Sequence, residues 1–347
     1  MNLIILTYFL INIMFVFFLV NSKKVLHLFN DNTFNNPQKV HTHEVSRSGG
    51  LSYLLLGFIY FILPEVNLQM VVYLYLILLL GLMEDIFKNI KPSLRFILIL
   101  MLSFICIVHI GYYINEFEIH FIDIFFKQNI FLSIFFTTIA LSVAINAYNL
   151  IDGFNGLLLG VTIIGVIGLI IISNKVGMND NAYFLIFFLI NIISLLIFNF
   201  PSGKIFMGDG GAYSTGYLVG IYSIILFNTS EISAWFFAIL LCYPMMELIV
   251  SFSRRILIKK KHAFSSDLNH LHSLIYLYFK RNSNVIINNY ANPLTSIIIW
   301  IFYSIQLLPL FFIYNNTLFM QLNFIFCIIT YLCFYLICNK VNNTKKY

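Results

Sequence analysis

The sequence predicts an all-α protein that crosses a membrane many times. Hydrophobic residues make up 60% of its 347 residues and charged residues only 10%, whereas an ordinary soluble domain has about 25% charged residues. Apolar runs long enough to cross the roughly 30 Å hydrocarbon core of a bilayer recur from one end of the chain to the other. Basic residues are distributed unevenly between the segments that join these runs, and this asymmetry orients the chain.

Eleven apolar runs are the expected membrane-spanning helices. Most have about 20 residues, the length at which a helix spans a bilayer. The first run lacks a basic start and a small-residue cleavage site, so we expect a retained helix and not a removed signal peptide. The runs cover residues 2–20, 48–64, 69–84, 95–113, 129–149, 157–173, 182–200, 212–228, 234–253, 293–314 and 318–338.

The lysines and arginines predict which side each connecting segment faces. With the N-terminus outside and the C-terminus inside, eighteen of them lie on the inner side and only Lys127 and Lys175 lie outside. Positive residues gather on the cytoplasmic side of membrane proteins, so the inner side is expected to be the cytoplasm. Adding or removing one helix would place many of the inner basic residues outside. The number of eleven helices and the predicted orientation therefore support each other. We expect residues 1–347 to form a single integral-membrane domain.

The composition argues against several other classes of protein. All five cysteines lie in apolar runs without a CxxC pair, which indicates neither a disulfide framework nor a metal site. The net charge of +6 fits inner loops near anionic headgroups. Without a basic surface that also contains aromatic residues, it does not indicate nucleic-acid binding.

Unusual polar residues gather in the segments that the predicted orientation places inside. Asp85, Asp152 and Asp209 follow or precede three different apolar runs there. Because a carboxylate in a membrane is costly, such residues are usually kept for a function. We therefore expect an active site on the cytoplasmic side. Its segments are 30–50, 81–95, 146–157, 199–211 and 254–290.

These side chains suit the chemistry of phosphate groups. Carboxylate oxygens are the ligands that Mg²⁺ prefers, so we predict a site for Mg²⁺, or for Mn²⁺, at Asp85, Asp152 and Asp209. Glycines beside Asp209 would let backbone N–H groups approach an anion. Basic and histidine residues of the last inner loop could hold the other side of a diphosphate. Together these features predict a phosphoryl-transfer site.

Each feature alone also has a simpler explanation. Asp85 and Lys88 could form a surface pair, and Asp209 could belong to an ordinary glycine-rich turn. The basic residues from 254 to 261 could only anchor the chain at the membrane. Asn146 and Asn149 could hydrogen-bond between helices. The coincidence of all of these features on one face favours a function.

The polar segments also contain motifs in a fixed order. They are Lys39-Val-His41 with Arg47-Ser-Gly49-Gly50, Gly81-Leu-Met-Glu84-Asp85, Asn146-Ala-Tyr-Asn149-Leu-Ile-Asp152-Gly153-Phe-Asn155-Gly156-Leu157, and Phe206-Met-Gly208-Asp209-Gly210-Gly211, before a loop with His270 and His272. This order resembles the polyprenyl-phosphate N-acetylhexosamine-1-phosphate transferase superfamily. The superfamily includes GlcNAc-1-phosphate transferases of O-antigen and teichoic acid synthesis and the MurNAc-pentapeptide translocase.

The resemblance implies transfer of an N-acetyl-aminosugar-1-phosphate from a UDP-sugar to polyprenyl (undecaprenyl) phosphate, with release of UMP and a need for Mg²⁺. UDP-N-acetylhexosamine and the lipid phosphate are then the expected partners. The expected location is a bacterial inner membrane, with the active site facing the cytoplasm, in a pathway for O-antigen, lipopolysaccharide, capsule or another cell-envelope glycan. The oligomeric state stays open, a homodimer included.

The resemblance also implies roles for individual residues. Asp209 is expected to be the first metal ligand, with Asp85 and Glu84 nearby as catalytic groups. One of these carboxylates either deprotonates the lipid phosphate or, in a two-step route, attacks the nucleotide diphosphate. Asp152 is expected to bind the nucleotide or its metal ion. The expected substrate-binding residues are Lys39, His41, Arg47, Asn146, Asn149, Asn155, Gly208, Gly210, Arg254, Arg255, His270 and His272.

Three positions depart from the superfamily pattern. Glu84 replaces the first of two paired aspartates, Asn155 replaces the second aspartate of the D-G-x-D-G block, and the histidine motif ends after His272. An amide supplies a donor that a carboxylate lacks, so we expect Asn155 to donate to a sugar or phosphate oxygen. Glu84 keeps the charge, whereas the second and third departures fit a divergent branch that serves O-antigen or capsule pathways and argue against the pentapeptide translocase.

Two other classes of function stay open. A transporter would place polar groups near the middle of the membrane, and the polar residues at one set of helix ends disfavour it. An inactive scaffold of a glycan assembly complex is supported only by Asn155.

Overall fold

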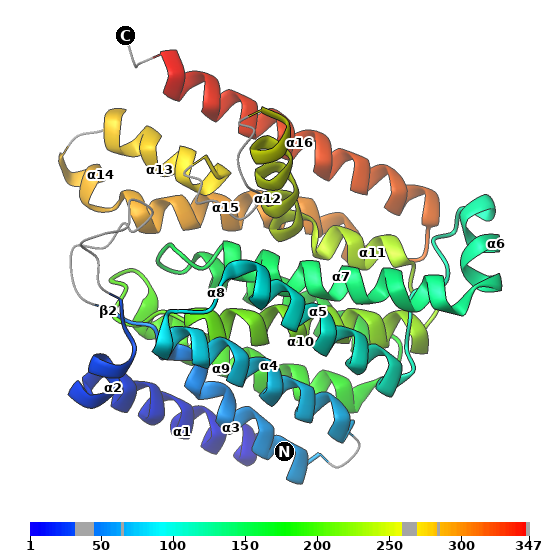
Figure 1. Ribbon diagram of the computed structural model, residues 1–347, viewed down its shortest axis with the longest axis horizontal. Coiled ribbons are helices and arrows are strands. Elements are labelled where there is room, and N and C mark those ends of the chain that lie inside the picture. Colours follow the sequence, from blue (N-terminus) through cyan, green and yellow to red (C-terminus); the bar gives the residue numbers. More distant parts are fainter. Residues whose placement is uncertain (32–44, 64–65, 259–268, 283–284, 345–347) are drawn as a thin grey trace.

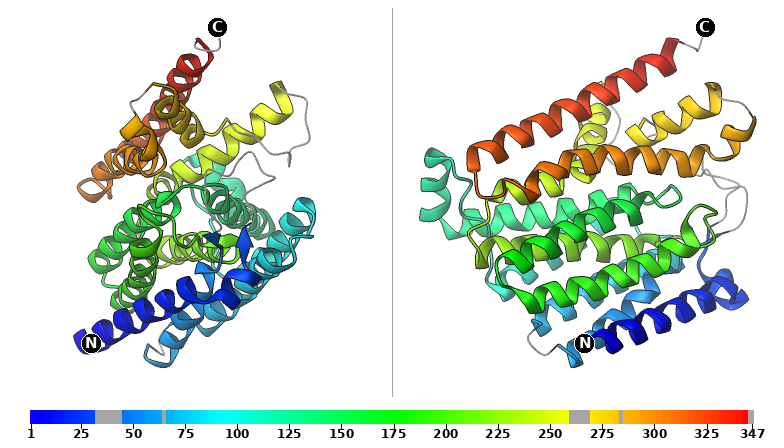
Figure 2. Two further views of the ribbon diagram at one scale, coloured as in Figure 1. Left: turned by 90° about the vertical axis from the view of Figure 1, so that its left-hand side faces the viewer. Right: turned by 180° about the vertical axis from the view of Figure 1, so that it is seen from behind.

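The protein is a bundle of helices in the computed structural model, which describes residues 1–31, 45–63, 66–258, 269–282 and 285–344 (Figure 1). The longer helices lie side by side, with α1 on one side of the bundle and α16 on the opposite side (Figure 2). These helices are α1 (Asn2–Asn21), α4 (Leu68–Phe87), α5 (Pro92–Ile110), α7 (Ile130–Leu150), α8 (Leu157–Lys175), α9 (Asn179–Asn199), α10 (Gly208–Thr229), α15 (Ala291–Leu307) and α16 (Thr317–Thr344).

Shorter elements complete the described part of the chain. They are α2 (Lys23–Leu28), β1 (Asn30–Asp31), β2 (Val45–Ser46), η2 (Gly49–Ser52), α3 (Tyr53–Gly57), η3 (Phe58–Phe61), α6 (His120–Gln128), α11 (Ala234–Leu240), α12 (Cys242–Ser253), η4 (Arg254–Ile258), α13 (Leu271–Asn282), α14 (Val285–Asn289) and η5 (Leu308–Phe311). In Figure 1, α6 lies at one end of the bundle, and α2, β2 and α14 lie at the other.

The predicted fold class is confirmed, because the protein is an all-α polytopic membrane protein. Among the described residues, strands occur only in one antiparallel pair, in which Asn30 of β1 lies opposite Ser46 of β2. Nine described helices are long and apolar enough to cross a membrane, or ten if the bent pair α11–α12 is one span. The predicted number of eleven spans and their orientation stay predictions.

Two predicted runs differ from a single long α-helix. In the run 234–253, α11 and α12 are bent by 69° around Leu241, and Pro244 in the first turn of α12 has no N–H to continue the helical hydrogen bonds across the bend. The run 48–64 forms one shorter apolar helix from Gly49 to Phe61, in which the 3₁₀ turns η2 and η3 flank α3. Neither the bend nor the 3₁₀ turns are visible in hydrophobicity alone.

Helix α10 forms the centre of the bundle. It packs against α4, α7, α8 and η2, and all of its residues from Gly208 to Leu226 are buried. Small residues such as Gly216 and Gly220 allow α7 to approach, because a Cβ at Gly216 would lie 2.7 Å from the Ile145 Cα. The N-terminus of the most buried helix therefore lies where α4 and α7 end.

Candidate active site

Asp209 lies in the first turn of α10, where its carboxylate contacts two arginines. Arg47 Nη2 is 2.8 Å from Asp209 Oδ1, and Arg95 Nη1 is 2.5 Å from Asp209 Oδ2. The positive end of the helix dipole also stabilises a carboxylate at this position. Asp209 is only 4% exposed, and the two guanidinium groups compensate its buried charge. The structure thus brings predicted residues Asp209 and Arg47 into direct contact.

Asp85 lies in the last turn of α4 and binds the N-terminus of α10. Its Oδ1 accepts the N–H of Asp209 and its Oδ2 accepts the N–H of Gly210, both at 2.9 Å. Free N–H groups at a helix start commonly bind anions, and here the anion is a side chain of the same protein. The N–H of Gly210, which we expected to hold a substrate phosphate, is therefore already bonded to Asp85.

Glycines allow the backbone of α10 to approach α4 at this point. A Cβ on Gly81 would lie 2.4 Å from the Gly210 N atom, and a Cβ on Gly208 would lie 2.3 Å from the Arg47 carbonyl oxygen. Gly208 also has a φ of +70°, a left-handed conformation that favours glycine. Close packing thus explains these glycines, and substrate contact by Gly208 stays a prediction.

Glu84 joins the same group of charges through Arg95. Its Oε1 is 3.4 Å from Arg95 Nη1, and its Oε2 accepts the N–H of Ile90 at 3.1 Å. Arg95 therefore lies between Glu84 and Asp209. Sequence reasoning counted Arg95 among the inner basic residues but gave it no role in the site.

Asp152 lies in the loop 151–156 between α7 and α8. The residue is half-buried, but its Oδ2 atom is fully buried and has no hydrogen-bond partner among the described residues. Burial raises the pKa of Asp152 to about 7; Arg47 opposes this rise, and the Asp209 and Asp85 carboxylates add to it. The three predicted aspartates, from three different helix ends, therefore lie within electrostatic reach of one another.

The three asparagines of the predicted site differ in how far they are already bonded. Asn146 Nδ2 donates to the Ser142 carbonyl of its own helix at 2.8 Å. The Asn149 side chain has no hydrogen bond to any described residue, so it can still bind a ligand. Asn155 is 7% exposed and donates its Nδ2 to the Pro201 carbonyl at 2.6 Å. The amide donor that we expected at the substrate is thus bonded to the protein.

His270 and His272 share one buried carboxylate. His270 Nδ1 is 3.2 Å from Glu247 Oε2, and His272 Nδ1 is 3.3 Å from Glu247 Oε1. Their rings are stacked in parallel with centroids 5.2 Å apart. The His272 ring also lies edge-on to Phe154 at 5.2 Å. The histidine pair therefore lies against the loop that contains Asp152.

The remaining predicted residues have other positions. Arg254 is buried and donates its Nη1 to the Tyr335 hydroxyl at 2.6 Å. It also lies near enough to His270 to help lower the pKa of that histidine, which is lowered mainly by burial. Arg255 follows it in the π-helical turn η4. Lys39 and His41 lie outside the described residues.

The family model described as glycosyl transferase family 4 matches residues 67–227. This segment is 161 of the 347 residues, and over it the chain is similar to glycosyl transferase family 4. The match includes Asp85, Asp152 and Asp209, and it supports a general role as a polyprenyl-phosphate sugar-1-phosphate transferase. No curated protein matches the sequence.

The carboxylates of this site fit a metal ion that keeps most of its ligands for water and phosphate. No group of three or more His, Cys, Asp or Glu side chains in the described ranges could enclose a metal ion. Mg²⁺ needs only one or two protein carboxylates when a substrate supplies phosphate oxygens. The unpartnered Oδ2 of Asp152 is such a ligand, whereas both oxygens of Asp85 already accept backbone N–H groups.

Two residues of the site were not found by sequence reasoning. Arg95 gave no signal that distinguishes it from other inner basic residues. Glu247 did give one, because it is an ionisable residue within the apolar run 234–253, and such a residue is a functional candidate by default.

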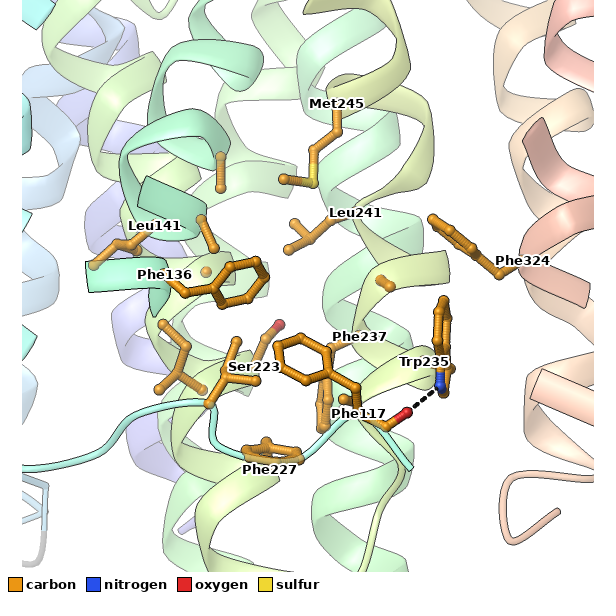
Figure 3. A pocket seen from close by; sticks show the side chains of 17 residues that line it. Phe117, Phe136, Leu141, Ser223, Phe227, Trp235, Phe237, Leu241, Met245 and Phe324 are labelled. Atoms are coloured by element: carbon orange, nitrogen blue, oxygen red, sulfur yellow. Dashed lines mark hydrogen bonds between the residues drawn. The ribbon is translucent and has the colours of Figure 1, made fainter. Parts of the chain in front are cut away.

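An apolar cavity of about 280 Å³ lies between α7, α10, α11 and α12 (Figure 3). Its lining includes Phe136, Leu141, Phe237 and Leu241 and contains no charged side chain. On α10 it begins at Gly220, eleven residues or about 16 Å beyond Asp209 at 1.5 Å per residue. The cavity is therefore separate from the carboxylate site and does not suit a phosphate group.

Proposed function

We propose that the protein transfers an N-acetylhexosamine-1-phosphate from a UDP-sugar to a membrane polyprenyl phosphate and releases UMP. The observation that supports this most directly is the cluster of Asp85, Asp152 and Asp209 with two arginines, within and beside the segment that matches the family. The proposed location is the cytoplasmic face of a bacterial inner membrane. The product would start an O-antigen, capsule or other cell-envelope glycan.

The proposed reaction replaces one phosphoanhydride bond by another and keeps the ester bond between the sugar and its phosphate. A P–O bond forms between an oxygen of the lipid phosphate and the phosphorus that bears the sugar, and the bridging P–O bond to UMP breaks. Negative charge gathers on the phosphate oxygens in the transition state, so catalysis needs positive groups in fixed positions. Arg47 and Arg95 are such groups, because Asp209 holds both of them at the helix terminus.

The charge of the cluster supports a cation as cofactor. The carboxyl groups of Glu84, Asp85, Asp152 and Asp209 lie among only two described arginines, Arg47 and Arg95. This excess of negative charge would repel a diphosphate and a lipid phosphate. Asp152 would hold Mg²⁺ or Mn²⁺. Asp209 would become a second ligand if one of its two arginines moves to the phosphates. The ion, when bound, supplies Lewis-acid stabilisation of the phosphate oxygens.

The test is a transfer assay with purified protein in lipid vesicles. Polyprenyl phosphate and a panel of labelled UDP-N-acetylhexosamines are supplied with Mg²⁺. We expect labelled lipid and free UMP with at least one donor. We also expect loss of activity in excess EDTA and its recovery with Mg²⁺ or Mn²⁺, because the excess carboxylate charge is then unbalanced.

One control reaction and two possible outcomes make the assay specific. Omission of the lipid phosphate should leave the UDP-sugar intact, which excludes simple hydrolysis. Full turnover in excess EDTA would remove the metal from the proposal. Absence of labelled lipid with every donor, from a protein that remains folded, would contradict the transferase function itself.

A further inference from the structure

Glu247 is a buried carboxylate that sequence reasoning left without a role. It lies on α12 and is 1% exposed. Besides the two histidines, its oxygens accept the Tyr243 hydroxyl and the Leu271 N–H, each at 3.3 Å. A carboxylate removed from water is costly unless its lone pairs are satisfied, and here four donors satisfy them.

The contacts of Glu247 fix the proton positions on both histidine rings. An ionised carboxylate only accepts hydrogen bonds, so each Nδ1 that faces it must bear a proton. The second nitrogen of each ring, Nε2, then points away from Glu247 and has no bond to any described residue. A neutral ring offers a lone pair at Nε2, and a protonated ring offers an N–H donor.

The pair also has a defined position and spacing. The two rings are parallel with centroids 5.2 Å apart, and both Nδ1 atoms face the same carboxylate, so each Nε2 lies on the side of its ring that faces away from Glu247. Phe154, two residues after Asp152, contacts the His272 ring. The histidines are thus held beside the loop that contains Asp152, although they follow this aspartate by more than a hundred residues in the sequence.

We propose that Glu247 is a positioning residue, which holds His270 and His272 in one tautomer with both Nε2 atoms presented to the diphosphate of the nucleotide-sugar substrate. This inference rests on the proposed function for the identity of the ligand. Residues that orient a metal-binding histidine through its second nitrogen commonly affect metal affinity or activity about 10-fold to 100-fold, and we expect an effect of the same order for a histidine that binds a diphosphate.

The central test is Glu247→Gln, which keeps the size of the side chain. An amide has one acceptor and one donor group, so it can accept Nδ1–H from one ring only, and the other histidine must move its proton to Nε2. We expect kcat/KM for the UDP-sugar to fall about 10-fold to 100-fold, with a changed pH profile. Nitrogen-15 NMR of the histidine rings should show the altered tautomer, with signals assigned from His270→Gln and His272→Gln.

Tyr243→Phe is the matched control. It removes another hydrogen bond to the same carboxylate but leaves both histidine contacts in place, so tautomers and kinetics should stay as in the wild type. In a His270→Gln/His272→Gln background, Glu247→Gln should cause no further loss, because its effect acts through the two rings. If Glu247→Gln fails to fold, Glu247→Asp keeps the charge and should show a smaller loss of the same kind.

The outcomes separate this inference from the proposed function. If Glu247→Gln lowers kcat/KM by the same factor in the His270→Gln/His272→Gln background as in the wild type, the positioning role is overturned and Glu247 serves the fold alone. Wild-type kinetics and tautomers in Glu247→Gln, with an active wild-type enzyme, would overturn the inference but leave the transferase function. A wild-type protein that neither turns over UDP-sugars nor binds UDP as a probe would overturn both.

Discussion

The Asp152 side chain combines a partly exposed position with a buried oxygen atom that has no hydrogen-bond partner among the described residues. Burial raises its pKa to about 7, whereas an aspartate in an unfolded chain has a pKa of about 3.9. Between these two values the folded protein holds a proton that the unfolded chain releases. The stability that this proton contributes is present at low pH and is lost as the pH rises through about 7.

We therefore expect the melting temperature of the metal-free protein to fall between about pH 4 and pH 7. Asp152→Asn should weaken this dependence, because the amide has no proton to lose. Mg²⁺ at the higher pH should restore stability to the wild type but less to the variant, if Asp152 is a ligand. Thermal unfolding in EDTA and in Mg²⁺ measures both effects, and an unchanged pH dependence in Asp152→Asn would contradict the raised pKa.

Asn155 holds three parts of the protein together. Its Nδ2 donates to the Pro201 carbonyl, and its backbone N–H donates to Asn292 Oδ1 at 2.8 Å. A carboxylate at this position would face the Pro201 carbonyl without a donor. The carboxylate oxygen in place of Nδ2 would itself have no donor at a position that is 7% exposed, and leaving a buried polar group unsatisfied costs about 1–3 kcal/mol, although an aspartate is what the superfamily pattern has here.

We expect Asn155→Asp to lower the melting temperature and to leave KM for the UDP-sugar unchanged. Asn292→Asp is the matched control, because it keeps the acceptor for the Asn155 N–H and loses only a contact of 3.4 Å. Thermal unfolding and steady-state kinetics of both variants check this. A raised KM with normal stability would instead support the original expectation that the Asn155 amide contacts the substrate.

At the scale of the helix, the site depends on the close approach of α4 to α10. We expect Gly81→Ala to destabilise the protein by about 1–3 kcal/mol, the usual cost of overpacking, and to reduce activity. The added Cβ would lie 2.4 Å from Gly210 and would separate Asp85 from the N–H groups that it accepts. Gly168→Ala in α8 is the control, because its Cβ would meet its neighbours at ordinary distances of 3.5 Å or more. Equal behaviour of the two variants would contradict the packing argument.

The elements also show which features the sequence can predict. Hydrophobic runs identified the helices, and the motifs at their ends identified the aspartates of the site, because both depend on residue type and spacing. The partners of these side chains depend on how each helix is rotated about its axis. For this reason the pairing of Asp209 with Arg95, and of Glu247 with His270 and His272, appears only in the structure. The bend at Leu241 was missed for a similar reason, since one apolar run can form two short helices.

At the scale of the whole molecule, the unequal distribution of basic residues predicts which end of the bundle faces the cytoplasm. Lys91, between α4 and α5, is exposed near the carboxylate cluster, and Asn174 is exposed in the last turn of α8. If the N-terminus is outside, the first position is cytoplasmic and the second is external.

We expect a cysteine at Asn174 to react with an impermeant thiol reagent added to intact cells, and a cysteine at Lys91 to react only after the membrane is opened. The five natural cysteines lie within apolar helices, so the parent protein should give a low background and serves as the control. The two positions also test the number of membrane spans between them, because one span more or fewer would place both cysteines on the same side. Labelling of Lys91→Cys in intact cells would place the carboxylate cluster outside, where a cytoplasmic UDP-sugar could not reach it.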